Sequence, residues 1–300
     1  MRRRTAARLV LFGALTVATG CVALGRTPPP HRGESWAQER TDEGARALFA
    51  EAGVEGAFVV LDERRAVRTV VNGEEAATRH VPASTFKIAS TLIGLETGVI
   101  AGEHFSLPWD GREHAIAAWN GNHDLRSAIR HSVVWFYQEV ARRVGAARMR
   151  HWLNAFDYGD KNMGGAVDTF WLDDTLHISP REQVEFLRRL HARELPVKDE
   201  HAALTVKLLV SEEWPTPDGP ASIRAKTGWS TEGDRAVLWL VGFVERGMDR
   251  YTFATLLLCP KAAADEKAAL RWSLSKRLLV RAGALPVLPK RDGCELPCEK

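Results

Sequence analysis

The chain of 300 residues contains little cysteine and lacks several motifs that mark common enzyme classes. Its four cysteines are too few for a disulfide-dense scaffold. Neither Cys-x-x-Cys nor His-Glu-x-x-His occurs and the histidines are scattered, so the sequence predicts no metal site. Gly-x-Ser-x-Gly, Gly-x-Gly-x-x-Gly and the P-loop are also missing, which argues against an esterase elbow, a dinucleotide fold and a nucleotidase.

The body of the chain also lacks a strong charge of either sign. The formal net charge of +3 depends on four arginines within the first twenty residues, and the rest carries 37 basic and 38 acidic residues. No Lys/Arg-rich run follows, so we expect no nucleic-acid partner. The apolar content of 45% is sufficient for a buried core in one large domain or two compact lobes.

The first 21 residues have the pattern of an export signal. A basic start precedes the apolar stretch Leu9–Leu15, and small residues then lead to Cys21. The pattern leaves open ordinary cleavage after a small residue or, since it resembles a bacterial lipoprotein signal, lipidation of Cys21; Ala18 departs from the usual Leu. Either reading predicts an envelope protein, periplasmic or membrane-anchored, with residues 22–40 as a Pro-rich tether. No later apolar stretch is long enough to span a bilayer.

The remaining cysteines have different settings. Cys259 ends an apolar strand-like run, which predicts a buried side chain. Cys294 and Cys298 lie in the polar tail, residues 289–300, and the sequence leaves open whether they pair in an oxidising compartment.

The hydrophobic pattern predicts an α+β fold with an antiparallel sheet of about five or more strands from both ends of the chain. Two expected strands form a hairpin near the N-terminus, three follow near the C-terminus, and a terminal helix packs on them. The region between is dominated by helical periodicity with no convincing strand. We therefore expect a sheet-and-helix lobe and an inserted helical lobe. The ranges are 56–61 and 66–71 for the hairpin, 221–228, 236–244 and 251–258 for the later strands, 262–281 for the helix, 41–103 with 216–288 for the first lobe, and 104–215 for the second.

Three short polar motifs carry the chemistry: Ser84-Thr85-Phe86-Lys87, Ser132-Val133-Val134 and Lys226-Thr227-Gly228. The first places a hydroxyl one helical turn from an amine, and the last can hold an anionic substrate beside it. Chance predicts about one Ser-x-x-Lys in a chain of this length; a second match, residues 273–276, is interpreted as a helix surface.

The helix after Ser84 has apolar residues all around its axis, which predicts a buried helix that ends at Gly98, with its first turn at the floor of a cleft. An apolar site favours the neutral amine of Lys87, which can then take the serine proton. The alternative is that Ser84 is only a helix N-cap, although a capping box would require Glu or Gln where Lys87 stands.

With these motifs the chain resembles the penicilloyl-serine transferase superfamily and, within it, the class D (oxacillinase-type) serine β-lactamases, over roughly residues 47–279. The specific signal is Ser132-Val133-Val134, because related penicillin-binding enzymes usually carry Ser-x-Asn there. Asp160 departs from the family's Asn. The other matches are Trp119-Asn120, Tyr158-Gly159-Asp160, Phe170-Trp171-Leu172 and the run 183–187.

The resemblance implies a β-lactamase/penicillin-binding-protein-like fold and a role for each site residue. Ser84 attacks the β-lactam carbonyl, with its own N–H and that of Trp229 as the oxyanion hole. Lys87, carboxylated by carbon dioxide, is the general base, and no other cofactor is implied. The remaining roles are a pocket around the carbamate (Val134 and Trp171), a proton relay (Ser132) and a site for the substrate carboxylate (Lys226, Thr227, Gly228 and Arg271).

Simpler interpretations stay open at this point. Trp171 would then be a core residue and Arg271 a solvated residue of the last helix, while Tyr158 is expected to be structural and Glu194 a surface residue. Besides a hydrolase, the motifs fit a penicillin-binding sensor or peptidase that acylates and stalls; a catalytically dead envelope lipoprotein is disfavoured because every polar position is filled. The sequence points to no obligate protein partner and leaves the substrate spectrum and the oligomeric state open.

Overall fold

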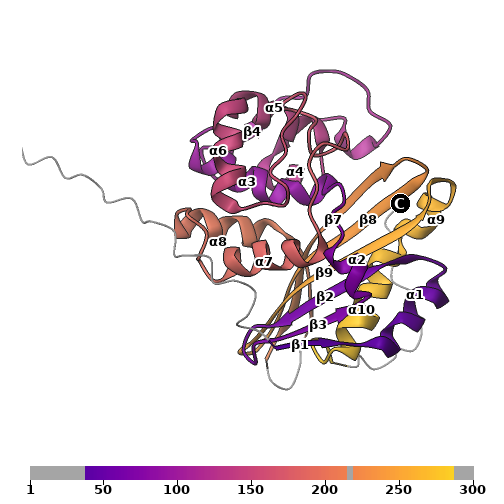
Figure 1. Ribbon diagram of the computed structural model, residues 1–300. Helices are drawn as coiled ribbons and strands as arrows, with labels where there is room; N and C mark the ends of the chain where they lie inside the picture. The colour runs from indigo at the N-terminus through magenta and orange to yellow at the C-terminus, as the bar shows by residue number, and fades with distance from the viewer. Residues whose placement is uncertain (1–37, 215–218, 287–300) are drawn as a thin grey trace, which may run out of the picture.

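The computed structural model describes residues 38–214 and 219–286, whose centre is a seven-stranded sheet in the order β1-β3-β2-β9-β8-β7-β6 (Figure 1). All neighbouring strands are antiparallel except β1 and β3, which are parallel. The predicted α+β fold is therefore confirmed. The strands of the sheet are β1 Gln38–Thr41, β2 Glu55–Asp62, β3 Val67–Val71, β6 Val210–Trp214, β7 Ala221–Glu232, β8 Arg235–Arg246 and β9 Asp249–Pro260.

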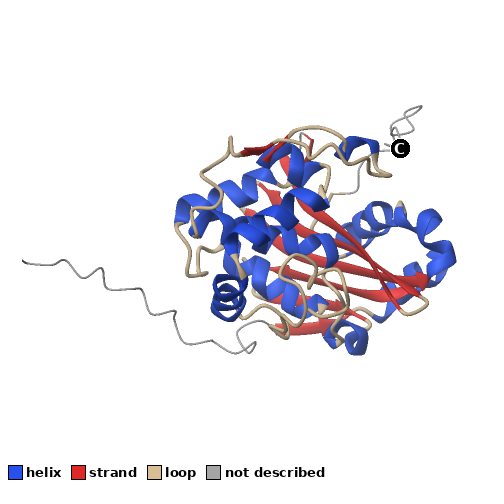
Figure 2. Cartoon of the chain, turned by 90° about the horizontal axis from the view of Figure 1, so that it is seen from above, coloured by secondary structure: helices blue, strands red, loops and turns tan. Residues whose placement is uncertain are grey.

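Helices cover both faces of the sheet, and Figure 2 shows them on either side of the strands. On β2, Val59 belongs to the core beneath one helical layer, whereas Phe58 and Val60 belong to the core beneath the other. This follows from the period of two in a strand, which sends successive side chains to opposite faces. The apolar runs that predicted the strands are continuous because both faces are buried.

The layer on one face contains α1 Arg46–Ala52 and α10 Leu270–Arg281. The other face carries most of the helices (Figure 1). Among them, α3 is buried along nearly its whole length. Burial of α3 and its end before Gly98, whose φ is +71°, confirm the sequence prediction. The helices on this side are α2 Gly73–Ala77, α3 Lys87–Glu96, α4 Leu125–Arg130, α5 Val134–Val144, α6 Ala146–Phe156, α7 Pro180–His191 and α8 Asp199–Leu208.

Two strand predictions were wrong. Residues 38–40, expected in the tether, belong to β1, because their backbone pairs with β3 although their side chains are exposed. The region 104–215 was expected to contain no strand, yet it ends in β6 and also holds the short pair β4 Ser106–Leu107 and β5 His123–Asp124. These strands are short or polar, so the alternation that reveals buried strands is missing.

The C-terminal helical region is divided by Ala269 into α9 Ala264–Ala268 and α10. The second Ser-x-x-Lys match lies on α10 but is not wholly at the surface, because Ser275 is buried and donates a hydrogen bond to Thr255. Cys259 is buried and free, as expected. Cys21, Cys294 and Cys298 lie outside the described residues.

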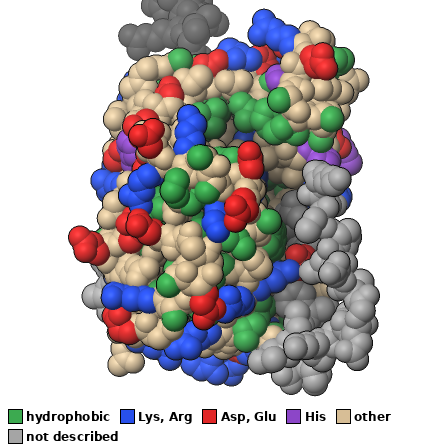
Figure 3. Space-filling model, turned by 90° about the vertical axis from the view of Figure 1, so that its right-hand side faces the viewer, with side chains coloured by type: hydrophobic (Ala, Val, Ile, Leu, Met, Phe, Trp, Pro, Cys, Tyr) green, Lys and Arg blue, Asp and Glu red, His purple; other side chains and the backbone are tan. Residues whose placement is uncertain are grey.

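The surface of the described residues mixes both charges. On the face shown in Figure 3, basic and acidic side chains are interspersed with apolar ones. Among the described residues, no helix combines the length and apolarity needed to cross a membrane.

Candidate active site

The segment that carries Ser84 is a short 3₁₀ helix, η3 Ala83–Phe86, which leads directly into α3. Ser84 is half-buried, although the residues on both sides are buried, so its hydroxyl marks an opening in the core. Ala83 has φ of +49°, a left-handed conformation that is energetically unfavourable for a residue other than glycine. The N-caps here are Pro82 and Phe86, so the N-cap interpretation of Ser84 is wrong.

Lys87 begins α3 and is completely buried. Its Nζ lies 2.7 Å from Ser84 Oγ and 5.6 Å from the centre of the Tyr137 ring. Burial first, and the nearby charge of Lys226 second, hold the pKa of the Lys87 amine well below its usual value. The neutral amine expected from the sequence is therefore favoured by the fold.

Ser132 lies between α4 and α5 with φ of +56°, a second strained residue at the same site. Its Oγ accepts a 2.9 Å hydrogen bond from Nζ of Lys226. Val133 is fully buried, whereas Val134, expected to be buried, is only half-buried. Val133 packs into the core, whereas Val134 is the first residue of α5 and stays partly exposed.

Strand β7 forms the other wall. Lys226 is buried, Thr227 is half-buried, and the Lys226 ammonium also donates to the Thr227 carbonyl at 2.9 Å. A Cβ on Gly228 would lie 3.0 Å from the Pro82 carbonyl oxygen, so glycine allows β7 to approach the serine segment this closely. Trp229, the next residue, is 41% exposed, which is unusual for so large an apolar side chain.

Arg271 reaches this wall from α10. Its Nη1 donates to the Gly228 carbonyl at 3.1 Å and its Nε to the Ala268 carbonyl at 2.7 Å, so the solvated interpretation is wrong. No carboxylate lies within ion-pair distance of it in residues 38–214 and 219–286.

Three basic groups therefore line the site: Lys87, Lys226 and Arg271. Burial destabilises the charged form of each. Burial, and then the charge of Arg271, lowers the pKa of Lys226 to about 7. Burial lowers the pKa of Arg271 to about 10. A bound carboxylate would stabilise the charged form of both groups, so the site is suited to an anionic substrate.

Trp171 is fully buried and stacks on Phe86, with ring centres 5.5 Å apart. Its indole Nε1 is buried without a hydrogen-bond partner among the described residues. A tryptophan that only fills the core normally finds an acceptor for this N–H, so an unpaired donor beside the residue preceding Lys87 points to a ligand or modification.

Two neighbours of the serine were not assigned a role from the sequence. Gln183 on α7 donates to Thr85 Oγ1 at 2.8 Å, and Thr85 donates to the Pro82 carbonyl at 2.7 Å. In the sequence Gln183 is only one member of the matching run 183–187, and it is its burial in the fold that identifies it. Tyr158 is buried edge-on against Phe86, which fits the structural role expected of it. The Glu194 carboxylate is half-exposed and pairs with an arginine, as expected of a surface residue.

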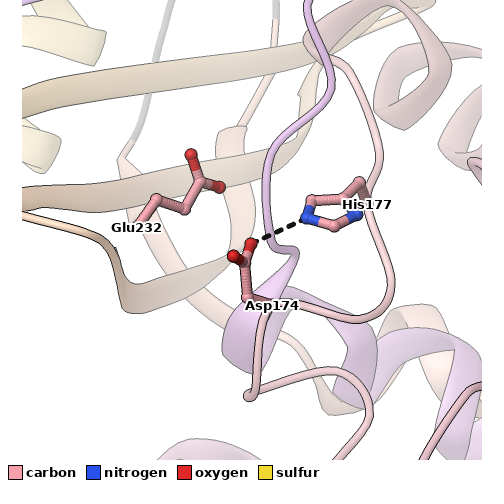
Figure 4. Close-up of side chains that lie close together, drawn as sticks. All are labelled: Asp174, His177 and Glu232. Atoms are coloured by element: carbon pink, nitrogen blue, oxygen red, sulfur yellow. Dashed lines mark hydrogen bonds and ion pairs between the residues drawn. The ribbon is translucent and has the colours of Figure 1, made fainter.

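A further polar cluster lies at the end of β7, where Asp174, His177 and Glu232 approach one another (Figure 4). Their ligand-type atoms lie within 4.8 Å of one another, so the fold forms a group with metal-ligand chemistry that no sequence motif showed. His177 bonds Asp160 through Nδ1 at 3.2 Å and Asp174 through Nε2 at 2.8 Å. Glu232 accepts hydrogen bonds from the Val81 N–H and from His80. These pairings account for the cluster without an ion.

Comparison with known proteins agrees with this geometry. The family model described as "Penicillin binding protein transpeptidase domain" matches residues 56–275. Beta-lactamase OXA-48 of Klebsiella pneumoniae is 38% identical over 240 residues, which are 80% of this chain and 88% of that protein.

Two solved structures are also similar. A class D β-lactamase from Sebaldella termitidis superposes with a TM-score of 0.79 at 28% identity, covering 84% of this chain and all of that one. The C-terminal domain of the BlaR penicillin-receptor of Bacillus licheniformis gives 0.74 at 29% identity, covering 83% and 98%. The sequence relationship over most of both chains, together with the shared fold, places the chain in the class D β-lactamases, enzymes that hydrolyse the amide bond of β-lactams.

Proposed function

We propose that the protein hydrolyses penicillin-type β-lactams through an acyl-enzyme on Ser84, with carboxylated Lys87 as the general base. The observation that carries this proposal is the 2.7 Å distance between Ser84 Oγ and an amine that is completely buried. A nucleophile and a base within hydrogen-bonding reach form the basic unit of covalent acyl transfer.

The residues around a carboxylated Lys87 fit that group. A carbamate forms only on the neutral amine, and burial favours this form of Lys87. The unpaired indole N–H of Trp171 is a donor of the kind that a carbamate oxygen requires, and Val134 is proposed to contribute apolar surface to the same pocket. When present, the group supplies an oxygen base close to the serine hydroxyl.

The other residues bind and orient the substrate. Lys226, Thr227 and Arg271 are proposed to hold the substrate carboxylate, while Ser132, already bonded to Lys226, passes a proton to the leaving nitrogen. The backbone N–H groups of Ser84 and Trp229 are proposed as the oxyanion hole. We also propose an envelope location, on the basis of the N-terminal sequence.

Turnover of nitrocefin by the purified protein tests the hydrolase, and Ser84→Ala tests its nucleophile. We expect the variant to fold normally and to lose several powers of ten in kcat. Intact-mass measurement should show a covalent adduct on the wild type only. Hydrolysis by the variant at nearly the wild-type rate would eliminate Ser84 as the nucleophile.

A separate experiment tests the carbamate. Carbon-13 NMR of protein incubated with labelled bicarbonate should show a carbamate signal that disappears as the pH is lowered, because protonation of Lys87 removes the reactive amine. Val134→Asp should remove the signal by stabilising the ammonium form, and the acyl-enzyme should then accumulate. Absence of the signal, with rates indifferent to bicarbonate, would refute this part of the proposal.

A second function deserves a test because of the similarity to the BlaR penicillin-receptor domain. A sensor of that kind would acylate Ser84 and stall. Stoichiometric release of product followed by a stable adduct would identify the sensor, whereas many turnovers per Ser84 would identify the hydrolase.

A further inference from the structure

The segment leading to Ser84 is held at Val81 from two strands. The Val81 N–H donates to Glu232 Oε1 at 2.7 Å, and the Val81 carbonyl accepts from the indole of Trp239 at 2.9 Å. Glu232 is the last residue of β7, and Trp239 belongs to β8. Both backbone polar groups of Val81 are thus fixed by side chains of the sheet, three residues before the serine.

These contacts fix a strained turn. Ala83 stands in the left-handed region between Val81 and Ser84, and such a conformation persists only where its surroundings enforce it. Gly228 is packed against the Pro82 carbonyl on the same side. Release of Val81 would therefore let the turn relax and move Ser84 relative to β7, which carries the residues proposed to bind the substrate.

The carboxylate of Glu232 also binds a histidine that must be charged. His80 Nδ1 lies 2.9 Å from Glu232 Oε2, and its Nε2 lies 2.6 Å from Glu75 Oε1. An ionised carboxylate cannot donate a proton, so both hydrogen bonds exist only when both ring nitrogens are protonated. His80 is 5% exposed, and its backbone pairs with Ile178, which ties the same place to the segment before α7.

We propose that Glu232 is a positioning residue for acyl transfer: its carboxylate fixes Val81, and hence the Ser84 turn, for as long as His80 is an imidazolium. The inference deepens the proposed function and rests on it, since it assumes that Ser84 is the nucleophile. No residue of this pairing touches the proposed substrate or the reacting atoms directly.

The pairing gives the rate a dependence on pH. Burial lowers the pKa of His80, but the hydrogen bonds and charges of Glu232 and Glu75 outweigh burial and raise it above the usual 6.5. Above that pKa the neutral ring can donate to only one of the two carboxylates, and the other, which is half-buried, loses its donor. Acylation is therefore expected to fall on the alkaline side.

The other charged groups near His80 and Glu232 contribute to the same titration. His177 lies near Glu232, in the segment before α7 (Figure 4). Burial raises the pKa of Glu232, but the hydrogen bonds from His80 and the Val81 N–H, followed by the charges of His80 and His177, outweigh burial and lower it. Burial lowers the pKa of His177, but the hydrogen bonds and charges of Asp174 and Asp160 outweigh burial and raise it. These groups are unchanged in the variants below.

Two variants of Glu232 separate its two contacts. Glu232→Ala removes the acceptor of the Val81 N–H, and we expect acylation of Ser84 by nitrocefin to slow about 10- to 100-fold, as small displacements of reacting groups do. Glu232→Gln keeps an oxygen acceptor for Val81 but removes the charge. Its rate at about pH 6 should approach that of the wild type, and its alkaline limb should shift to lower pH, because His80 loses one of its two anions.

A matched control comes from another histidine–glutamate pair on the same sheet. Glu245 on β8 bonds the half-buried His191 at 3.2 Å, and within residues 38–214 and 219–286 no hydrogen bond or ion pair joins this pair to the serine segment. Glu245→Gln should lower stability and leave the acylation rate and its pH profile unchanged. Burst kinetics and adduct mass measure acylation. Nitrogen-edited NMR of the His80 ring gives its pKa, which is compared with the midpoint of the alkaline limb of the acylation pH profile.

Three outcomes are informative. A slowed Glu232→Ala with a shifted Glu232→Gln profile supports the proposal, provided that both variants unfold cooperatively. An adduct formed at the wild-type rate by Glu232→Ala, or coincident alkaline limbs for Glu232→Gln and wild type, overturns it. Absence of both nitrocefin turnover and a Ser84 adduct on the wild type would instead refute the proposed function, so the two failures are distinguishable.

Discussion

Replacing Trp171 by phenylalanine should weaken the binding of carbon dioxide by the protein much more than it changes the free energy of unfolding of the carbamate-free protein. The indole N–H of Trp171 is buried without an acceptor among residues 38–214 and 219–286, and an unpaired buried donor costs about 1–3 kcal/mol. In the carbamate-free protein, Trp171→Phe removes that cost. It also leaves a cavity whose cost is of similar size, about 1–3 kcal/mol, so the free energy of unfolding should change little.

The carboxylated protein should behave differently. There the indole is proposed to donate to an anionic oxygen, and a hydrogen bond to a charged group contributes about 1.5–3 kcal/mol. Its loss should weaken retention of carbon dioxide on Lys87 by about 10- to 100-fold, since about 1.4 kcal/mol corresponds to a factor of ten. The stabilising effect of bicarbonate on unfolding should shrink by the same amount of free energy.

Urea unfolding with and without bicarbonate measures this difference, and carbon-13 NMR gives the bicarbonate concentration at half-saturation. Trp135→Phe is the matched control, because that indole donates to the Trp119 carbonyl at 3.0 Å and has a partner already. The control should be destabilised equally in both conditions. An identical bicarbonate response in wild type and Trp171→Phe would refute the role assigned to the indole.

Three further predictions concern other parts of the chain. Arg271→Ala should raise KM for anionic β-lactams at least tenfold with a smaller effect on kcat, which steady-state kinetics measures, and an unchanged KM would contradict carboxylate binding. Burial lowers the pKa of His191, but the hydrogen bond to Glu245 and the nearby charge of Glu63 outweigh burial and raise it. The stability that His191 contributes is therefore complete below about pH 6.5 and is lost as the pH rises through its folded-state pKa. Denaturant unfolding at several pH values should show this decline, and Glu245→Gln should flatten it. Cys21→Ser should move the exported protein from the membrane to the soluble fraction, and unchanged fractionation would favour ordinary signal cleavage.

The buried strands and the buried helix could be predicted because burial leaves a simple pattern in the sequence. Strands β2, β8 and β9 and helix α3 are apolar over much of their length, and their positions follow from period and turn residues. Strand β6 could not be found in this way, because its central residues Glu212 and Glu213 are exposed at the sheet edge. Strand β1 depends on backbone pairing alone.

The candidate site was predictable to the extent that its residues form local motifs. Ser84 and Lys87 are neighbours on one turn, so sequence spacing brings them together. The contact between Lys226 and Ser132 joins residues that are distant in the chain, and only the family resemblance suggested it. Nothing local distinguishes Glu232, because its contact with Val81 is created by the end of one strand meeting the start of an unrelated turn.

The pairing of β2 with β9 has a consequence for how the protein acquires activity. Val59 of β2 lies opposite Ala254 of β9, so β2, which is synthesised early, cannot form this pair until β9 is synthesised near the end of the chain. Loops of this length close slowly, and a sheet dominated by such pairs forms late in folding. Strand β9 lies between β2 and β8, so it joins the hairpin β2–β3, which precedes Ser84, to the hairpin β7–β8, which carries Lys226. A refolding chain should therefore regain helix first and acylation by penicillin last.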